Sequence, residues 1–319
     1  MEVKVLAEKI KTNVQKVIIG KDTVINIITT SLIAGGHVLL EDVPGTGKTV
    51  LARSLAKSIN CDFKRVQFTP DLMPSDLTGI NYYNQKEGEF TLRKGPVFTN
   101  ILLADEINRA TPRTQSSLLE CMEEKQVSID GTTYKLDSPF FVIASQNPVE
   151  SQGTFPLPEA QLDRFLIKIN MGHPTLEEGK QIFKRFIEDD PLEELQSVCG
   201  KEEIIEARKV CRKIFVSDDV QEFILKIVEA TLHDDNIILG VSPRGSLAML
   251  KAAQVYAAIN GRDFVTPDDV ITLAPYVFGH RLIVKNALKI KGNFSCEEIV
   301  RQIVRTVEVP TESWGKERN

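Results

Sequence analysis

The segment Asp42-Val43-Pro44-Gly45-Thr46-Gly47-Lys48-Thr49 constrains this 319-residue chain more than any other feature. In a phosphate-binding loop, glycines let backbone N–H groups close around phosphates, a lysine reaches the outer phosphates, and a hydroxyl binds Mg²⁺. The usual pattern is G-x-x-x-x-G-K-[ST], and Asp42 departs from it at the first position. A coincidental glycine-rich turn is the alternative, but the loop lies between an apolar run and a helical pattern, as phosphate binding requires. We therefore predict binding of ATP with Mg²⁺.

The first half of the chain has the pattern of an α/β protein. Short apolar runs typical of buried strands alternate with helically spaced residues, and they cover residues 37–40, 63–68, 101–104, 140–144 and 165–169. The last run alternates with polar residues, which favours a sheet edge. Strands that alternate with helices imply right-handed crossovers. We predict a domain with a doubly wound parallel sheet over residues 1–172. It begins with two helices, which are separated by a break near residues 18–21.

Two β-hairpins are predicted as insertions in this sheet domain. Asp130-Gly131, between residues 126–129 and 132–136, has the residue types that a type I′ turn requires. The other hairpin spans residues 80–92, with Gly88 near its tip.

Residues 173–319 have a different pattern. Strand patterns stop, and amphipathic helices are predicted at residues 175–186, 202–212, 220–232, 243–259 and 267–276. Ser217 and Thr266 are the predicted N-caps of two of them. We predict a second, all-helical domain with a frayed tail from Trp314 onward.

Polar residues with catalytic potential follow two of the predicted strands. Asp105 and Glu106 stand at the carboxyl end of one strand, the edge where open α/β sheets bind ligands. We predict that Asp105, with Thr49, holds Mg²⁺ and that Glu106 polarises the attacking water; a solvated acidic turn is the alternative. Asn147 follows the next strand and is predicted to orient the water or contact the terminal phosphate, although a simple Asn-Pro turn has the same pattern.

Two arginines are further candidates. Arg164 stands at the end of a predicted helix, where a cation also stabilises the helix dipole, so a purely structural role is open. Arg244 stands just inside a helix N-terminus, where a cation is disfavoured by roughly 0.3–1 kcal/mol. A nearby anion would offset that cost.

Composition excludes several classes of protein. The net charge of −5 gives little general attraction for nucleic acid or anionic lipid, although a local basic stripe remains possible. Five cysteines, scattered and without a C-x-x-C pair, argue against a disulfide framework and a zinc site and are expected to be reduced packing residues. The chain shows neither a signal peptide nor a long apolar run, so a cytoplasmic protein without a membrane span is expected.

At this point the residues resemble the MoxR family of AAA+ ATPases. The matching stretches span both predicted domains: residues 40–49, 67–79, Ala104-Asp105-Glu106-Ile107-Asn108-Arg109-Ala110, Ser145-Gln146-Asn147-Pro148, 159–165 and Ser242-Pro243-Arg244. The resemblance implies an αβα nucleotide-binding core over residues 1–172 and a helical lid over residues 173–319. The hairpins are similar to the helix-2 insert and the pre-sensor-1 hairpin of that group, which also contains magnesium-chelatase subunits and replicative helicases.

The resemblance also implies roles for individual residues. Asn147 matches sensor 1, Arg164 an arginine finger that acts on a neighbour's nucleotide, and Arg244 sensor 2, while Lys48 and Glu106 complete the catalytic set. Asp42 is a variant common in the family. The implied nucleotide-binding residues are Ile18, Ile19, Gly20, Asp42, Val43, Pro44, Gly45, Thr46, Gly47, Lys48, Thr49 and Val50. A finger supplied in trans implies a homo-oligomer, expected to be a hexameric ring.

Three functions follow as hypotheses. The first, implied by the resemblance, is an ATP-driven remodelling chaperone that matures or inserts metal into client complexes with a partner carrying a von Willebrand A domain. The second is a nucleic-acid motor, favoured only by aromatic and basic residues at the hairpins such as Tyr82, Phe90 and Lys86; a solvated face explains them more simply. A magnesium-chelatase-like subunit is a variant of the first. A scaffold without turnover is disfavoured by the intact Asp105-Glu106 pair.

Overall fold

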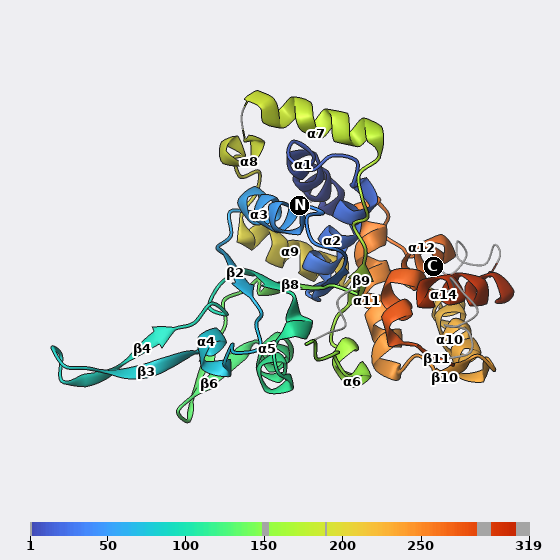
Figure 1. Cartoon of the computed structure of the whole chain (residues 1–319). Helices are drawn as coiled ribbons and strands as arrows, with labels where there is room; N and C mark the ends of the chain where they lie inside the picture. Colours follow the sequence, from blue (N-terminus) through green and yellow to red (C-terminus); the bar gives the residue numbers. More distant parts are fainter. Residues whose placement is uncertain (1, 149–152, 189, 286–294, 311–319) are drawn as a thin grey trace.

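The structure is a computed structural model that describes residues 2–148, 153–188, 190–285 and 295–310. The tail predicted to be frayed, from Trp314, lies outside these residues. A sheet domain forms the centre of the molecule, one hairpin projects from it as an arm, and a group of helices stands on the opposite side (Figure 1).

Within the described residues, five strands form one parallel sheet in the order β2-β5-β8-β1-β9. These strands are β1 (Val38–Glu41), β2 (Phe63–Gln67), β5 (Ile101–Asp105), β8 (Phe141–Gln146) and β9 (Ile167–Ile169). The predicted doubly wound sheet and the edge position of β9 are confirmed. Strand β2 differs from the expectation of a buried strand, because it forms the opposite edge and most of its side chains are not buried.

Side chains of the central strands alternate between two hydrophobic cores. Val38 and Leu40 of β1 pack with α1 (Val3–Gln15), α2 (Asp22–Ala34) and α3 (Lys48–Ser58), whereas Leu39 packs on the other face with α5 (Pro112–Glu124). This period of two buries both faces of the strand, which explains why the strand appears in the sequence as a continuous apolar run. The helix break predicted near residues 18–21 is confirmed.

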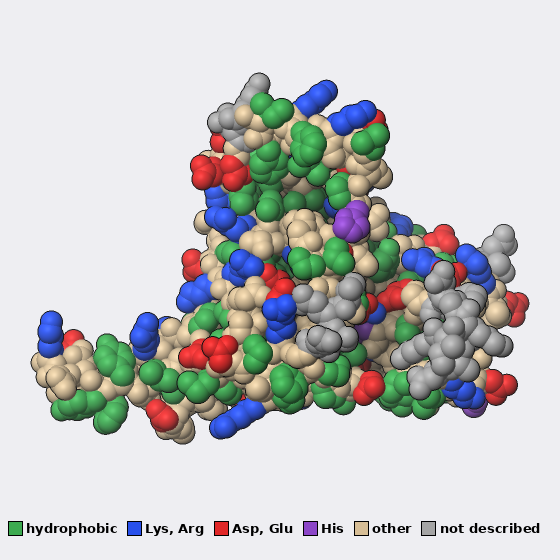
Figure 2. Space-filling view, in the orientation of Figure 1, with side chains coloured by type: hydrophobic (Ala, Val, Ile, Leu, Met, Phe, Trp, Pro, Cys, Tyr) green, Lys and Arg blue, Asp and Glu red, His purple; other side chains and the backbone are tan. Residues whose placement is uncertain are grey.

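Both predicted hairpins are present. Strands β3 (Gly79–Asn84) and β4 (Glu89–Lys94) form the long arm of Figure 1, and β6 (Gln126–Ile129) and β7 (Thr132–Lys135) form the shorter hairpin. Asp130 and Gly131 have φ angles of 47° and 80°, as a type I′ turn requires. Hydrophobic side chains show along the arm in Figure 2.

The C-terminal part is mainly helical, but it is not all-helical as predicted, because two short strands pair within it. Its helices are α7 (Leu176–Glu188), α8 (Pro191–Glu194), α9 (Lys201–Cys211), α10 (Asp218–His233), α11 (Pro243–Ile259), α12 (Pro267–Phe278) and α14 (Cys296–Thr306). Ser217 and Thr266 accept the expected N-cap hydrogen bonds. The structure adds the helices α8 and α14 and a small antiparallel pair, β10 (Ile237–Leu239) with β11 (Ile283–Val284). These strands are too short to show a period in the sequence.

The C-terminal helices lie in two places. Helix α7 lies over α1, where Arg185 donates to the carbonyl oxygens of Gln15 and Lys16 (2.6 Å each). Helices α9 and α11 pack directly on α2 and share one hydrophobic cluster with it. The boundary between residues 172 and 173 stays a prediction.

Within the described residues, no helix is long and apolar enough to cross a membrane. The same residues contain no group of three or more His, Cys, Asp or Glu side chains that could hold a metal ion. The five cysteines are free thiols. Burial raises the pKa of Cys121 and Cys211 to about 12, in keeping with packing roles.

Candidate functional site

The phosphate loop connects β1 to the N-terminus of α3. Gly47, the N-cap, has a φ of 90°, a left-handed conformation that glycine adopts readily, and no side chain caps the helix. The first N–H groups of α3 therefore point out of the helix without an internal partner, which is an anion-binding arrangement. Lys48 donates to the carbonyl oxygens of Asp42 (3.0 Å) and Val43 (2.9 Å), so its ammonium lies folded back over the loop.

The irregular Asp42 has a structural explanation. Its carboxylate is buried and accepts hydrogen bonds from the backbone N–H groups of Val43 (2.9 Å), Met171 (2.9 Å) and Gly172 (3.0 Å). The side chain thus fastens the start of the loop to the segment after β9. Three N–H groups therefore compensate the negative charge that Asp42 brings to the start of the loop.

The residues before Asp42 connect the loop to the last helix. Lys168 of β9 forms ion pairs with Glu41 (2.9 Å) and with Glu297 of α14 (2.9 Å). Burial works against the charged form of Lys168, but the two carboxylates outweigh it and raise the pKa to about 12. The strand that carries the phosphate loop is therefore tied electrostatically to a helix of the C-terminal part.

The segment implied to line the adenine lies between α1 and α2. Ile18 and Ile19 are buried, and Gly20 has a φ of 69°, a left-handed conformation that glycine adopts readily, with the side chain of Glu178 on α7 packed against it. Nearby, Val17 packs with Val50 of α3 and with the leucines of the α8 region, Leu192 and Leu195. Helices α7 and α8 thus cover this segment and join it to the start of α3.

Asp105 lies at the carboxyl end of β5 and is held by two neighbours. Its Oδ2 accepts hydrogen bonds from Arg65 of β2 (2.7 and 3.1 Å), and its Oδ1 accepts one from the hydroxyl of Ser145 on β8 (2.5 Å). The guanidinium of Arg65 thus forms an ion pair with this carboxylate.

Glu106 has a positive φ of 56°, which is uncommon for a residue other than glycine and costs energy that the surroundings must supply. Its backbone N–H donates to Ser145 Oγ (2.9 Å), which helps to hold this conformation. Its Oε2 accepts a hydrogen bond from Gln67 Nε2 (2.7 Å) and forms an ion pair with Arg109, whose Nε lies 3.1 Å away. Two side chains therefore restrain the carboxylate predicted to polarise water.

Asn147 is buried just after β8, the strand that lies between β5 and β1 in the sheet. Asn108 donates to its carbonyl oxygen at 3.5 Å. Because the strands are parallel, their carboxyl ends share one edge of the sheet, and Asn147 therefore stands between the phosphate loop and the Asp105-Glu106 pair.

These residues fit ATP with Mg²⁺. The loop offers unpaired N–H groups and a lysine for phosphates, and Asp105 and Thr49 offer the hard oxygen ligands that Mg²⁺ prefers. Mg²⁺ uses few protein ligands when phosphates and waters complete its shell, so a larger acidic cluster is not needed.

The structure does not bring Arg164 and Arg244 to this edge. Arg164 Nη1 lies 3.2 Å from Glu123 Oε2, and Arg244 Nη2 lies 2.9 Å from Glu123 Oε1. Glu123 is near the end of α5, next to Met122, whose carbonyl oxygen contacts His37 immediately before β1 (3.0 Å). The two arginines therefore lie together at the amino edge of the sheet, across β1 from the phosphate loop of their own chain.

Sequence reasoning missed several residues of the site: Arg65, Gln67, Arg109, Ser145 and Glu123. Arg65 and Gln67 share one face of β2, and Gln67 pairs in register with Asp105. Polar residues at alternate positions at the end of a predicted strand are the sequence pattern that could have identified them. Glu123 carries no such pattern, because its role depends on two arginines distant in sequence.

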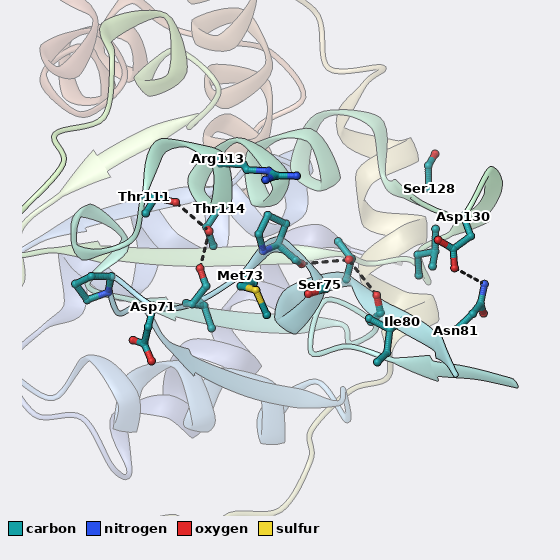
Figure 3. Close-up of a pocket in the computed structure, with 16 residues that line it drawn as sticks. Asp71, Met73, Ser75, Ile80, Asn81, Thr111, Arg113, Thr114, Ser128 and Asp130 are labelled. Carbon is teal, nitrogen blue, oxygen red and sulfur yellow. Dashed lines mark hydrogen bonds between the residues drawn. The ribbon is translucent and has the colours of Figure 1, made fainter. Parts of the chain in front are cut away.

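A large hollow of ≈700 Å³ lies elsewhere, between residues 70–81, the start of α5 and the turn of the β6–β7 hairpin. Asn81 donates to Asp130 (3.0 Å) and ties the two hairpins together at one end of it (Figure 3). None of the predicted catalytic residues lines this hollow.

The chain is similar to characterised families over most of its length. The "ATPase family associated with various cellular activities (AAA)" matches residues 37–167, and the "AAA lid domain" matches residues 229–303. Chaperone MoxR1 of Mycobacterium tuberculosis is 39% identical over 93% of this chain and 80% of its own length. Protein MoxR of Methylorubrum extorquens is 30% identical over 95% of both chains.

A solved structure agrees with these relatives. The crystal structure of a Cytophaga hutchinsonii protein, described as a candidate ATPase, superimposes with a TM-score of 0.90 at 39% identity and covers 97% of this chain and 96% of that chain.

Proposed function

Because the chain belongs to the MoxR family of AAA+ ATPases, we propose that it hydrolyses ATP with Mg²⁺ at sites shared between subunits and acts as a remodelling chaperone. The observation that supports the shared site is the position of Arg164 and Arg244. Both lie at the amino edge of the sheet, held by Glu123, while the phosphate loop and carboxylates lie at the carboxyl edge.

At the carboxyl edge, the chain's own residues bind and orient the substrate. The N–H groups of α3 and Lys48 bind the phosphates, and Asp105 and Thr49 would hold Mg²⁺. Bound there, Mg²⁺ would supply charge stabilisation for the phosphates. Glu106, next to Asp105 at the end of β5, accepts the proton of the attacking water. Asn147 orients the water from the strand between them.

Hydrolysis requires that the restraints on Glu106 be released. Gln67 and Arg109 both contact Oε2 of Glu106. A carboxylate oxygen that already has two donors against it has little room to accept the proton of a water molecule. We infer that nucleotide binding and assembly move these side chains before the water is activated.

At the amino edge, Arg164 and Arg244 would reach the nucleotide of a neighbouring subunit. Such arginines stabilise the charge of the transition state and can contribute about 10³–10⁵ in rate. A site completed by a neighbour favours a closed ring, and a hexamer is the proposed size. We place the ring in the cytoplasm.

The output is proposed from the family. Relatives named as a chaperone and as MoxR proteins support remodelling of client protein complexes. Maturation or metal insertion with a von Willebrand A partner is the specific form that we propose. Co-purification of the chain from its native cell, with and without the Glu106→Gln change that would trap clients, tests for a client and for a partner.

A nucleic-acid motor is the second candidate, because the β3–β4 arm exposes Tyr82, Tyr83 and Phe90 by 43%, 55% and 73%. Aromatic rings of this kind can stack on bases. Salt-dependent binding of single-stranded DNA that stimulates hydrolysis would favour this candidate over the chaperone.

Glu106→Gln tests the catalytic assignment. We expect unchanged binding of a fluorescent ATP analogue and a loss of steady-state phosphate release of about 10²–10⁴-fold, the usual contribution of a general base. Lys48→Ala is the companion variant and should lose nucleotide binding itself. Hydrolysis retained in Glu106→Gln would remove Glu106 as the base.

A further inference from the structure

A second polar hollow of ≈260 Å³ lies at the amino edge of the sheet. It is lined by the loop before β1, the end of α5, the residues before β9 and one face of α11. Besides Arg164 and Arg244, it is lined by two lysines that the proposed function does not use, Lys125 and Lys251. Arg244 and Lys251 are seven residues apart, so they share a face of α11 with a rise of about 10 Å between them.

The hollow has an excess of positive charge. Arg281 is neutralised by Asp163, whose Oδ1 lies 2.6 Å from its Nε, and Glu123 is shared by Arg164 and Arg244. Within the described part of the chain, neither Lys125 nor Lys251 forms an ion pair. Desolvation lowers the pKa of Lys125, and the nearby guanidiniums of Arg208 and Arg212 and the ammonium of Lys251 lower it further. An anion in this hollow would relieve that repulsion.

Glu123 already occupies the place of such an anion. Its two oxygens contact one arginine each, so a single carboxylate holds both guanidiniums at one point. A phosphate group presents oxygens with similar spacing and more charge, and Arg pairs bind it in the same geometry. The contact therefore marks where an incoming phosphate would sit in relation to the two lysines.

We propose that this hollow is the receiving half of the shared nucleotide site, in which Lys125 and Lys251 bind the phosphates of the neighbouring subunit's nucleotide beside Arg164 and Arg244. Glu123 is the resident anion that those phosphates replace. The inference rests on the proposed shared site. It adds two phosphate-binding residues, Lys125 and Lys251, to the phosphate loop and the two arginines.

Lys125→Ala and Lys251→Ala, singly and together, test the proposal. Each should lower ATP turnover of the assembled protein on the order of 10-fold, since a hydrogen bond to a charged group is lost. Binding of a fluorescent ATP analogue, measured at protein concentrations too low for assembly, should stay unchanged because the chain's own loop is at the other edge. Lys209→Ala, on an exposed face of α9, is the matched control and should match the unmodified protein in both measurements.

Mixed assemblies separate this proposal from the shared site itself. The double lysine variant keeps its own loop, and Lys48→Ala keeps a complete receiving half, so an equimolar mixture should regain turnover. Arg164→Ala mixed with Lys48→Ala is the benchmark: if that pair gains nothing, the shared site is wrong.

If the benchmark recovers activity but the lysine variants behave like Lys209→Ala, only the present proposal is wrong. Weaker binding of the ATP analogue by the unassembled lysine variants would also overturn it. So would normal turnover combined with loss of binding to single-stranded nucleic acid.

Discussion

The two edges of the central sheet carry different parts of the candidate site. The carboxyl edge has the phosphate loop and two carboxylates, Asp105 and Glu106, each of which is paired with an arginine of that edge, Arg65 or Arg109. The amino edge has Arg164 and Arg244 around the carboxylate of Glu123. The phosphate loop and the candidate arginine finger thus lie at opposite edges, which is the arrangement expected when two copies of a chain build one site.

At both edges the charged side chains of the candidate site form ion pairs within the chain. At the carboxyl edge, Arg65 is paired with Asp105 and Arg109 with Glu106; at the amino edge, Glu123 is paired with both arginines. Partly exposed ion pairs of this kind are worth little each and can be exchanged for stronger partners. We therefore expect nucleotide, Mg²⁺ or a neighbouring subunit to replace these ion pairs at little energetic cost.

The strongest test of the comparison is Arg164→Ala. We expect turnover to fall by about 10³-fold or more, in the range of an arginine finger, and to recover partly when Lys48→Ala subunits are added. Phosphate release at matched protein concentration measures both effects. Arg301→Ala, an exposed arginine on α14, should leave turnover unchanged; a strict lack of recovery in the mixture would place Arg164 outside a shared site.

The amino edge should also be sensitive to acid. His37 is buried, accepts the N–H of Val142 at Nδ1 (3.0 Å) and contacts Met122 O through Nε2. Desolvation, assisted by the charges of Lys125 and Arg208 and opposed by the Met122 hydrogen bond, lowers its pKa to about 4. Between pH 6.5 and about 4, His37 is therefore protonated in the unfolded chain but neutral in the folded chain.

The free energy of unfolding should therefore fall by up to about 3 kcal/mol as the pH drops through that window. Below about pH 4, His37 is protonated in both states and causes no further loss of stability. Denaturant unfolding at several pH values measures the slope. His37→Gln can keep both hydrogen bonds without titrating and should flatten the slope. An unchanged slope in His37→Gln would assign the acid sensitivity to other groups.

At the carboxyl edge, Arg65→Met should free Asp105 for Mg²⁺. We expect the Mg²⁺ concentration for half-maximal binding of a fluorescent ATP analogue to fall roughly 3- to 10-fold, because a competing cation with a partly exposed pair is removed. Lys64→Met removes a cation from the other side of the same strand and is the control. A higher Mg²⁺ requirement would show instead that Arg65 supports the metal site.

The smallest effect is expected for Glu123→Gln. Loss of the resident anion removes a competitor of the incoming phosphate and leaves two arginines repelling each other in the free subunit. Nucleotide-dependent assembly should occur at a protein concentration roughly threefold lower, the size of one partly exposed ion pair. Analytical ultracentrifugation with ATP and without it measures this, and an unchanged midpoint would deny Glu123 that role.

Much of the fold could be predicted from local patterns. The apolar runs, the turn residues Asp130 and Gly131 and the N-caps Ser217 and Thr266 depend on neighbours in the sequence, and the structure confirms them. The edge position of strand β2 and the pairing of β10 with β11 were not predicted from the sequence. Whether a strand lies at an edge, or whether two or three residues pair at all, depends on what approaches from elsewhere in the chain.

For this protein, the sequence by itself indicated the phosphate loop, the two carboxylates at the end of β5 and the family, because spacing along the chain carries those features. Only the tertiary structure decided that the carboxylate of Asp42 accepts from the N–H groups of Met171 and Gly172 after β9. It also decided that Arg65 and Gln67 restrain the carboxylates, and that Arg164 and Arg244 meet at Glu123. These relations join residues far apart in sequence through β-sheet order, and the direction in which each side chain leaves the sheet follows from packing rather than from spacing.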